Sequence, residues 1–212
     1  MKSILTLLLV VLLTPCFAQE YTIKFDQVME STDSTTQATI DMMGATKMTW
    51  YISGKNFRLE TEMGMAGTTK LIYDGASEKM LMLMENPFIG NTYTVIHDSL
   101  DTPEANFTVV KTKETKKIAG YKCIKYTVTD GDGMESIVYA TPKIPTAASK
   151  SLYSGQVEGA VLCTISTIGA GDAKIESIQT ATEVTKGKIA ADKFSLEVPE
   201  GYTEFDMNSF GE

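Results

Sequence analysis

Apolar and polar residues alternate along most of this chain, and the alternation predicts β-strands. Between residues 21 and 185, short runs rich in Ile, Val, Thr, Tyr, Phe and Met are separated by turn residues at intervals of about ten. In the clearest run, Phe57, Leu59 and Met63 alternate with charged residues. A period of two is typical of a strand with one buried and one solvated face. We therefore predict a mainly β protein with about eleven strands, including one over residues 38–42.

Helical periodicity is scarce by comparison. Residues 146–159 favour a helix, but Gly155 and Gly159 shorten it, and residues 98–106 and 187–193 each favour no more than a helical turn. Because the connections are short, antiparallel meanders are expected, since parallel pairing needs long crossovers. A sheet of this size curls or splits unless it closes. A curled sheet with one or two short helices satisfies the pattern, and a β-sandwich is the alternative.

The first eighteen residues have the pattern of a secretory signal peptide. Met1-Lys2 is positively charged, residues 4–13 are almost wholly apolar, and Cys16-Phe17-Ala18 supplies small residues before Gln19. Such a run is too short to cross a membrane, which takes roughly twenty residues. We expect cleavage after Ala18 and a periplasmic or secreted protein with a single β domain over residues 19–212. Lipid attachment at Cys16 is the alternative, although Pro15 stands where a lipoprotein signal has Gly, Ala or Ser.

The composition is that of a globular domain, and its charge limits the expected partners. The 212 residues are 43% hydrophobic and 22% charged, which does not fit a disordered polymer or a coiled coil. Acidic residues number 27 against 19 basic ones, for a net charge of −8. An acidic chain is not expected to bind nucleic acid or an anionic lipid surface. No segment after residue 18 is apolar over a membrane-spanning length.

Two cysteines, Cys123 and Cys163, remain after the expected cleavage. An even pair in an oxidising compartment favours a disulfide, which would stabilise the fold by roughly 4 kcal/mol on the chain-entropy model. The alternative is two buried free thiols on separate strands. Spacing along the sequence does not distinguish the two.

Motifs for catalysis and metal binding are missing from the sequence. His97 is the one histidine, so a Ser-His-Asp triad or a His-rich metal site would depend on it alone. No nucleophile elbow, P-loop or HExxH motif occurs. The segment Asp130-Gly131-Asp132-Gly133 has Met134 where a calcium loop has its third oxygen ligand, which favours a tight turn. We predict no enzymatic activity and no cofactor.

Methionine is the anomaly of the composition. Nine of the 12 methionines lie between residues 29 and 84. Met80, Met82 and Met84 share one face of a predicted strand, about 7 Å apart. Methionine adapts to varied apolar partners, so this face is suited to a hydrophobic ligand, but it equally suits an ordinary core. Thioethers also bind monovalent copper, for which the candidate ligands are Met63, Met65, Met80, Met82 and Met84.

One stretch of the sequence resembles a known family. Residues 116–128, KKIAGYKCIKYTV, are similar to the K-x-I-A-G-Y-x-C-x-K-Y core of domain of unknown function 4412. Residues 137–141, IVYAT, resemble the strand that follows it, and residues 194–202, FSLEVPEGY, resemble the closing F-x-x-P-x-G-Y. The family's members are exported by Gram-negative bacteria and look related to the lipoprotein carriers LolA and LolB. The resemblance implies a LolA-like half-barrel, a strongly curved antiparallel sheet around an apolar cavity, and it assigns no catalytic residues.

The pattern and the resemblance together favour a non-enzymatic envelope protein that binds or carries a lipid or acyl chain in the concave face of its sheet. The alternative is a structural or interaction module of the envelope, with a filled core and a protein partner. Copper binding is the third hypothesis. The candidate ligand-binding residues are Met48, Trp50, Phe57, Met63, Leu71, Met80, Met82 and Met84.

Overall fold

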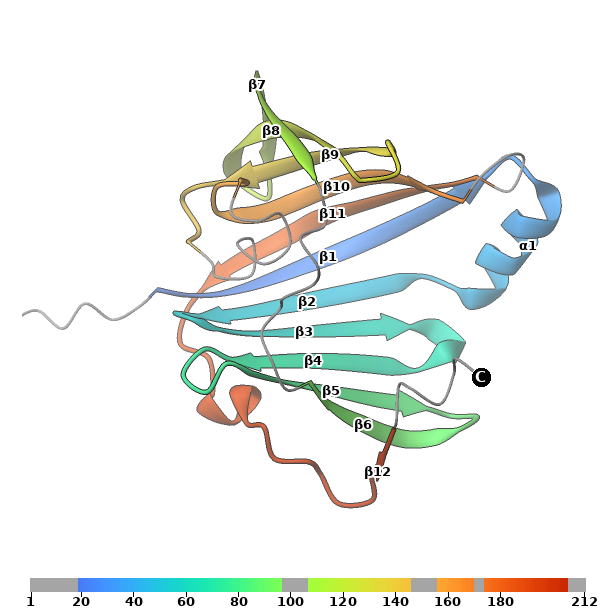
Figure 1. Cartoon of the computed structure of the whole chain (residues 1–212), viewed down its shortest axis with the longest axis vertical. Coiled ribbons are helices and arrows are strands. Elements are labelled where there is room, and N and C mark those ends of the chain that lie inside the picture. The colour runs from blue at the N-terminus through green and yellow to red at the C-terminus, as the bar shows by residue number, and fades with distance from the viewer. Residues whose placement is uncertain (1–18, 97–106, 146–155, 170–173, 206–212) are drawn as a thin grey trace, which may run out of the picture.

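The computed structural model describes residues 19–96, 107–145, 156–169 and 174–205, which form one large β-sheet with a single α-helix (Figure 1). The predicted signal peptide, His97 and most of the helix predicted over 146–159 lie outside these residues. The strands are β1 (Glu20–Ser31), β2 (Thr46–Ser53), β3 (Asn56–Met63), β4 (Thr68–Asp74), β5 (Lys79–Asn86), β6 (Gly90–Ile96), β7 (Thr108–Ile118), β8 (Tyr121–Thr129), β9 (Glu135–Thr141), β10 (Ala160–Ile168), β11 (Ile175–Lys186) and β12 (Thr203–Glu204). The helical elements are α1 (Ser34–Met43) and the 3₁₀ turns η1 (Gly64–Ala66) and η3 (Ala191–Phe194).

The sheet consists of two antiparallel meanders joined through its middle. Its order is β12-β6-β5-β4-β3-β2-β1-β11-β10-β9-β8-β7, so β1 pairs with both β2 and β11. Strands β1 to β6 form the first meander, and β7 to β11 form the second. The short β12 adds to β6 in parallel, and every other pair is antiparallel. The prediction of an antiparallel, mainly β fold is confirmed.

The strong curvature expected from the family resemblance is not found. The sheet is open, with β7 and β12 at its edges, and it is not strongly curled. Its twelve strands are accommodated by twist and by register shifts in β1–β11, β9–β10 and β7–β8. A strongly curved half-barrel around an apolar cavity is therefore the wrong description, and so is a sandwich of two separate sheets.

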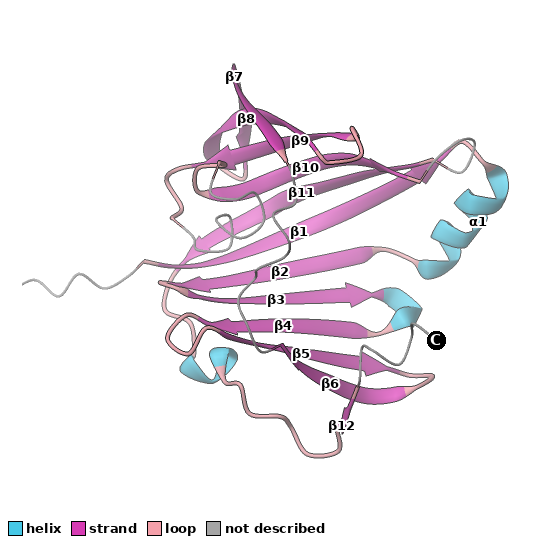
Figure 2. Ribbon diagram, viewed as in Figure 1, coloured by secondary structure: helices cyan, strands magenta, loops and turns pink. Residues whose placement is uncertain are grey.

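The strand predicted over residues 38–42 is also wrong, because these residues belong to α1 (Figure 2). The Asp33 side chain caps the helix by accepting a hydrogen bond from the Thr36 backbone N–H at 2.7 Å. Gly44, at φ 77°, ends it in a conformation that favours glycine. Only Ile40 of the helix is buried, so its sequence carries little of the 3.6-residue periodicity that predicts a helix.

The main core lies where the two meanders meet. Tyr21, Ile23 and Phe25 of β1 are buried at 0–3% exposure and pack against residues of the second meander such as Leu162 and Ala181. Smaller clusters lie at either end of the sheet, one around Tyr126 on β8 and one around Leu81 on β5. Among the described residues, no helix is long and apolar enough to cross a membrane.

Candidate functional site

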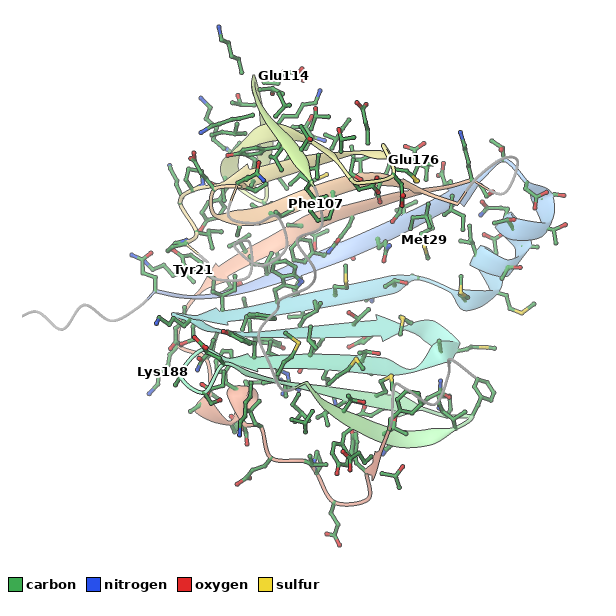
Figure 3. All side chains as sticks on the ribbon, viewed as in Figure 1. Tyr21, Met29, Phe107, Glu114, Glu176 and Lys188 are labelled. Atoms are coloured by element: carbon green, nitrogen blue, oxygen red, sulfur yellow. The ribbon has the colours of Figure 1, made fainter. Side chains whose placement is uncertain are left out.

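The eight residues predicted to bind a ligand all lie on one face of the first meander. The registers pair Trp50 with Leu59, Leu59 with Leu71, and Leu71 with Met82. Paired residues on neighbouring strands point to the same face, and so do residues two apart on one strand. Figure 3 shows the yellow sulfur atoms along β2 to β5. We call the following set the methionine face: Met48, Trp50, Phe57, Met63, Leu71, Met80, Met82 and Met84.

The methionine face is neither a sealed core nor a fully solvated surface. Met80 is buried at 6% exposure, and the other seven side chains are partly exposed. Met48 and Trp50 pack against the main core. Phe57, Leu71 and Met82 belong to no buried cluster within the described part of the chain. The face therefore begins at the main core and extends away from it over β3, β4 and β5.

Aromatic rings give the methionine face rigid points. The rings of Phe57 and Tyr73 stack at 5.2 Å between centroids, and Phe25 contacts Trp50 at 5.5 Å in a tilted arrangement. Such pairs hold their geometry better than methionine side chains do. The Trp50 indole Nε1–H is buried and has no hydrogen-bond partner among the described residues. An unpaired buried donor costs free energy.

The opposite face of β4 and β5 is covered by residues 189–205, which we call the strap. Ile72, Leu81 and Leu83 alternate with residues of the methionine face and are only 1–4% exposed. Leu196 and Tyr202 of the strap pack against them. The strap contains residues 194–202, which resemble the closing motif of the family, but its apolar residues follow no period of 2 or 3.6 that would predict where it packs.

A polar cluster around Glu60 holds the start of the strap. The carboxylate lies 2.6 Å from the Arg58 guanidinium and 3.2 Å from the Lys193 ammonium, and Tyr51 OH donates to it at 3.3 Å. Arg58 Nη1 also donates to the Lys193 backbone carbonyl at 3.1 Å. Burial alone would raise the pKa of Glu60, but the Arg58 and Lys193 charges outweigh it and lower that pKa. Glu60 is therefore ionised at neutral pH and ties β3 to η3.

A second cluster holds the end of the strap. Glu85 of β5 pairs with Lys70 of β4, and Tyr202 OH donates to the Glu85 carboxylate at 2.6 Å. The hydrogen bonds from Lys70 and Tyr202 lower the pKa of Glu85. Burial and the bond to Glu85 raise the pKa of Tyr202 to about 12. The phenol stays protonated and remains a donor at every physiological pH.

Both cysteines belong to the main core. Cys123 of β8 and Cys163 of β10 are buried and carry free thiols. Burial, with a contribution from Cys163, raises the pKa of the Cys123 thiol to about 11. A thiol with such a pKa is a poor nucleophile at neutral pH. The disulfide between these residues stays a prediction for the protein in an oxidising compartment.

The structure does not gather the five methionines of the copper hypothesis into one site. Met65 lies in η1 and is 60% exposed, while β4 separates Met63 on β3 from Met80, Met82 and Met84 on β5. Among the described residues, no group of three or more His, Cys, Asp and Glu side chains is placed to hold a metal ion. Copper binding itself stays untested.

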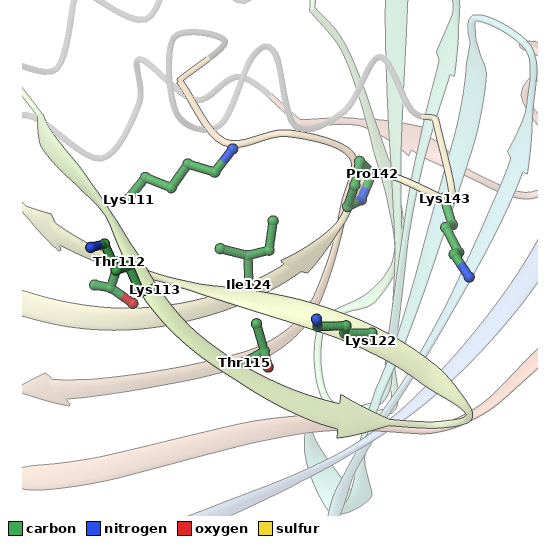
Figure 4. A pocket seen from close by; sticks show the side chains of 8 residues that line it. All are labelled: Lys111, Thr112, Lys113, Thr115, Lys122, Ile124, Pro142 and Lys143. Atoms are coloured by element: carbon green, nitrogen blue, oxygen red, sulfur yellow. The ribbon is translucent and has the colours of Figure 1, made fainter.

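A pocket lies at the other end of the sheet, where sequence analysis named no candidate residues. It is formed by residues of β7, β8 and the turn after β9, and its volume is about 370 Å³. We call it the lysine pocket, and its lining residues are Lys111, Thr112, Lys113, Thr115, Lys122, Ile124, Pro142 and Lys143 (Figure 4). The signal in the sequence was the presence of four lysines within residues 111–117.

By its fold, the chain belongs to the class of open and mostly antiparallel β-sheet domains, and known structures contain a similar sheet. Two solved structures of PNGF-II, in the C2 and P21 space groups, match with a TM-score of 0.54 and 18% sequence identity. The matches cover 91% of this chain but only 32% and 33% of the PNGF-II chains, so this chain spans about a third of their length. At this identity the likeness shows the fold alone. No curated protein matches the chain.

The family follows from the sequence match. Residues 34–160 match the model of the domain of unknown function DUF4412, which is more than half of the chain. The chain belongs to this family, and the resemblance drawn from residues 116–128 is confirmed to that extent.

Proposed function

We propose that this protein binds a hydrophobic ligand, a lipid or an acyl chain, on the methionine face. One observation carries the proposal. The eight candidate residues form a continuous surface on β2 to β5, and seven of them are partly exposed, while Ile72, Leu81 and Leu83 on the opposite face of β4 and β5 are buried. An exposed apolar surface of this kind is rare on a soluble protein unless something binds there.

The chemistry of the methionine face suits an acyl chain better than a ligand of fixed shape. Methionine side chains are unbranched and polarisable, so they repack around flexible apolar partners. The stacked Phe57–Tyr73 pair provides a rigid wall. The proposal includes an exported protein with residues 1–18 as its signal peptide, and it includes no catalytic step.

Native mass spectrometry with lipid extraction, followed by titration with a fluorescent fatty acid, tests the proposal. We expect saturable uptake by the wild type. Met82→Lys places a charge in the middle of the methionine face and should weaken uptake at least tenfold, because a cation would have to be desolvated against an acyl chain. The matched control is Thr49→Lys, which adds the same charge on the opposite face of β2.

The outcomes separate the proposal from its alternative. Ligand-free protein that takes up no fatty acid would favour the structural module, whose partner should then be recovered by crosslinking. Equal loss in Met82→Lys and Thr49→Lys would place the binding elsewhere on the molecule.

A further inference from the structure

The lysine pocket lies beside an irregularity in the edge strand β7. Lys111 pairs with Tyr126 and Thr115 with Ile124, so three residues of β7 lie opposite the single residue Lys125 of β8. Thr112 Oγ1 donates to the Lys125 backbone carbonyl at 3.1 Å and stabilises the irregular segment. A bulge of this kind bends its strand and redirects side chains. Here the bulge ends at Thr115, which pairs with Ile124, and both residues line the pocket.

The region around the pocket is rich in basic residues, although the whole chain is acidic. The protein carries a net charge of −8, yet seven lysines lie within residues 111–143. Four of these, Lys111, Lys113, Lys122 and Lys143, line the pocket. Lys111 forms an exposed ion pair with Glu158 at 2.8 Å. Within the described part of the chain, the other three form no ion pair with a carboxylate.

The pocket is also partly apolar. Figure 4 shows the Ile124 side chain at its centre, with Lys111 extending over the hollow toward Pro142 and Lys122 beside Thr115. The hydroxyls of Thr112 and Thr115 belong to the same lining. Its volume of about 370 Å³ lies at the lower end of the range for small-molecule sites, about 300–1,000 Å³. A cationic rim around a small apolar centre matches a compact anion with an apolar substituent.

We propose that the lysine pocket binds a phosphate monoester that carries a small apolar group. A phosphate monoester holds a charge of about −1.5 to −2 near neutral pH and has three strong acceptor oxygens. Several ammonium groups on flexible stems can approach such a group from different sides, whereas a planar carboxylate is better matched by arginine. The pocket lies at the β7 edge, apart from the methionine face on β2 to β5, so this inference does not rest on the proposed function.

Edge protection also places lysines on a bulged strand, because charge and irregularity discourage pairing with another chain. Such lysines need no ligand and act through their number rather than their position. A test must therefore compare lysines that line the pocket with lysines of the same strand that do not. Lys116 and Lys117 of β7 meet this requirement, since neither lines the pocket.

The experiment is calorimetric titration of the full chain with phenyl phosphate at low ionic strength, with inorganic phosphate and phenol as partial ligands. We expect saturable binding of phenyl phosphate that is tighter than binding of either partial ligand. The double substitution K111Q/K122Q should weaken it by about tenfold or more, because each charge-assisted bond contributes strongly. The control K116Q/K117Q removes the same net charge and should change the affinity less than about twofold, as expected for screened surface charges. Circular dichroism checks that both variants remain folded.

A second arm uses vesicles of phosphatidylcholine with and without phosphatidic acid, which presents a phosphate monoester as a lipid head group. Flotation with the phosphatidic acid vesicles alone, abolished in K111Q/K122Q and kept in K116Q/K117Q, would assign the ligand to a lipid. Calorimetric binding without flotation would assign it to a soluble ester. Absence of saturable binding in both arms, or equal weakening by the two double substitutions, would overturn the proposal.

Discussion

The two faces of the first meander are built from the same strands but are covered differently. On one face the strap seals Ile72, Leu81 and Leu83 and is held by ion pairs and hydrogen bonds to Glu60 and Glu85. On the other face, most side chains of the methionine face remain partly exposed. The strap therefore completes one face, and within the described residues no comparable segment packs against the methionine face. Alternation alone predicts that one face is apolar, but here β5 carries apolar residues on both faces, and the strap covers only one of them.

The largest expected difference between the faces is in the cost of truncating a leucine. Leu81→Ala should lower the free energy of unfolding by about 2–5 kcal/mol, because the strap and sheet would enclose a cavity. Leu71→Ala on the methionine face should cost about 1–2 kcal/mol, since its space opens toward solvent and no sealed cavity forms. Denaturant unfolding of both variants checks this prediction. Equal costs would mean that the methionine face is a sealed core.

The next effect concerns the cluster that holds the strap. Glu60→Gln should destabilise the protein by about 1–3 kcal/mol, because it leaves the Arg58 guanidinium without its carboxylate in a partly buried position. Lys24→Gln is the control, since it breaks the exposed ion pair with Glu183 and should cost less than about 1 kcal/mol. Thermal or denaturant unfolding distinguishes the two. A loss no larger than that of the control would show that the strap does not depend on Glu60.

Acid should also loosen the strap, because protonation of Glu60 and Glu85 removes the charges that pair with Arg58, Lys193 and Lys70. The pKa values of Glu60 and Glu85 are lower in the folded protein than in the unfolded chain. Their contribution to stability is therefore complete above the unfolded pKa of about 4.3 and is lost as the pH falls through the lowered folded values. Arg58 and Lys193 face the Glu60 carboxylate, and Lys70 and Tyr202 face that of Glu85. The pH dependence of unfolding between pH 6 and 3 should be flatter in an E60Q/E85Q variant, and an unchanged slope would contradict the assignment.

The smallest effect is expected on the methionine face itself. Met82→Gln keeps the shape of the side chain and should change stability by about 0.5 kcal/mol, as for other partly exposed positions. Leu83→Gln, one residue along on the sealed face, should instead cost several times more, because the amide would be buried without partners. Similar losses at the two positions would remove the distinction between the faces.

Part of this structure follows from the sequence and part does not, for physical reasons. Alternation in runs such as Phe57–Met63 predicts strands because side-chain burial has the same period as the backbone. The shared face of Trp50, Leu71 and Met82 follows from hairpins with short turns, which restrict the register. Helix α1 was missed because Ile40 is its one buried residue, and a cap at Asp33 determines it more than periodicity does.

The alternation of apolar and polar residues does not predict contacts between residues that are far apart in the sequence. The pairing of β1 with β11 and the placement of the strap depend on contacts between residues more than 100 positions apart, such as Tyr202 with Glu85. The lysine pocket depends on the bulge in β7, which has no simple signature in the sequence. The prediction of a half-barrel was wrong because the curvature of a sheet depends on the position of its bulges and kinks and not on the number of its strands.

The most direct test of the central claim uses Trp50, which is the single tryptophan of the chain and lies on the methionine face. A fatty acid brominated along its chain quenches indole fluorescence only on close contact. Titration of the wild type with this acid should quench the Trp50 emission saturably, and unbrominated fatty acid should reverse the quenching by competition. Saturable fatty acid uptake with unchanged Trp50 emission would place the ligand elsewhere and contradict the account.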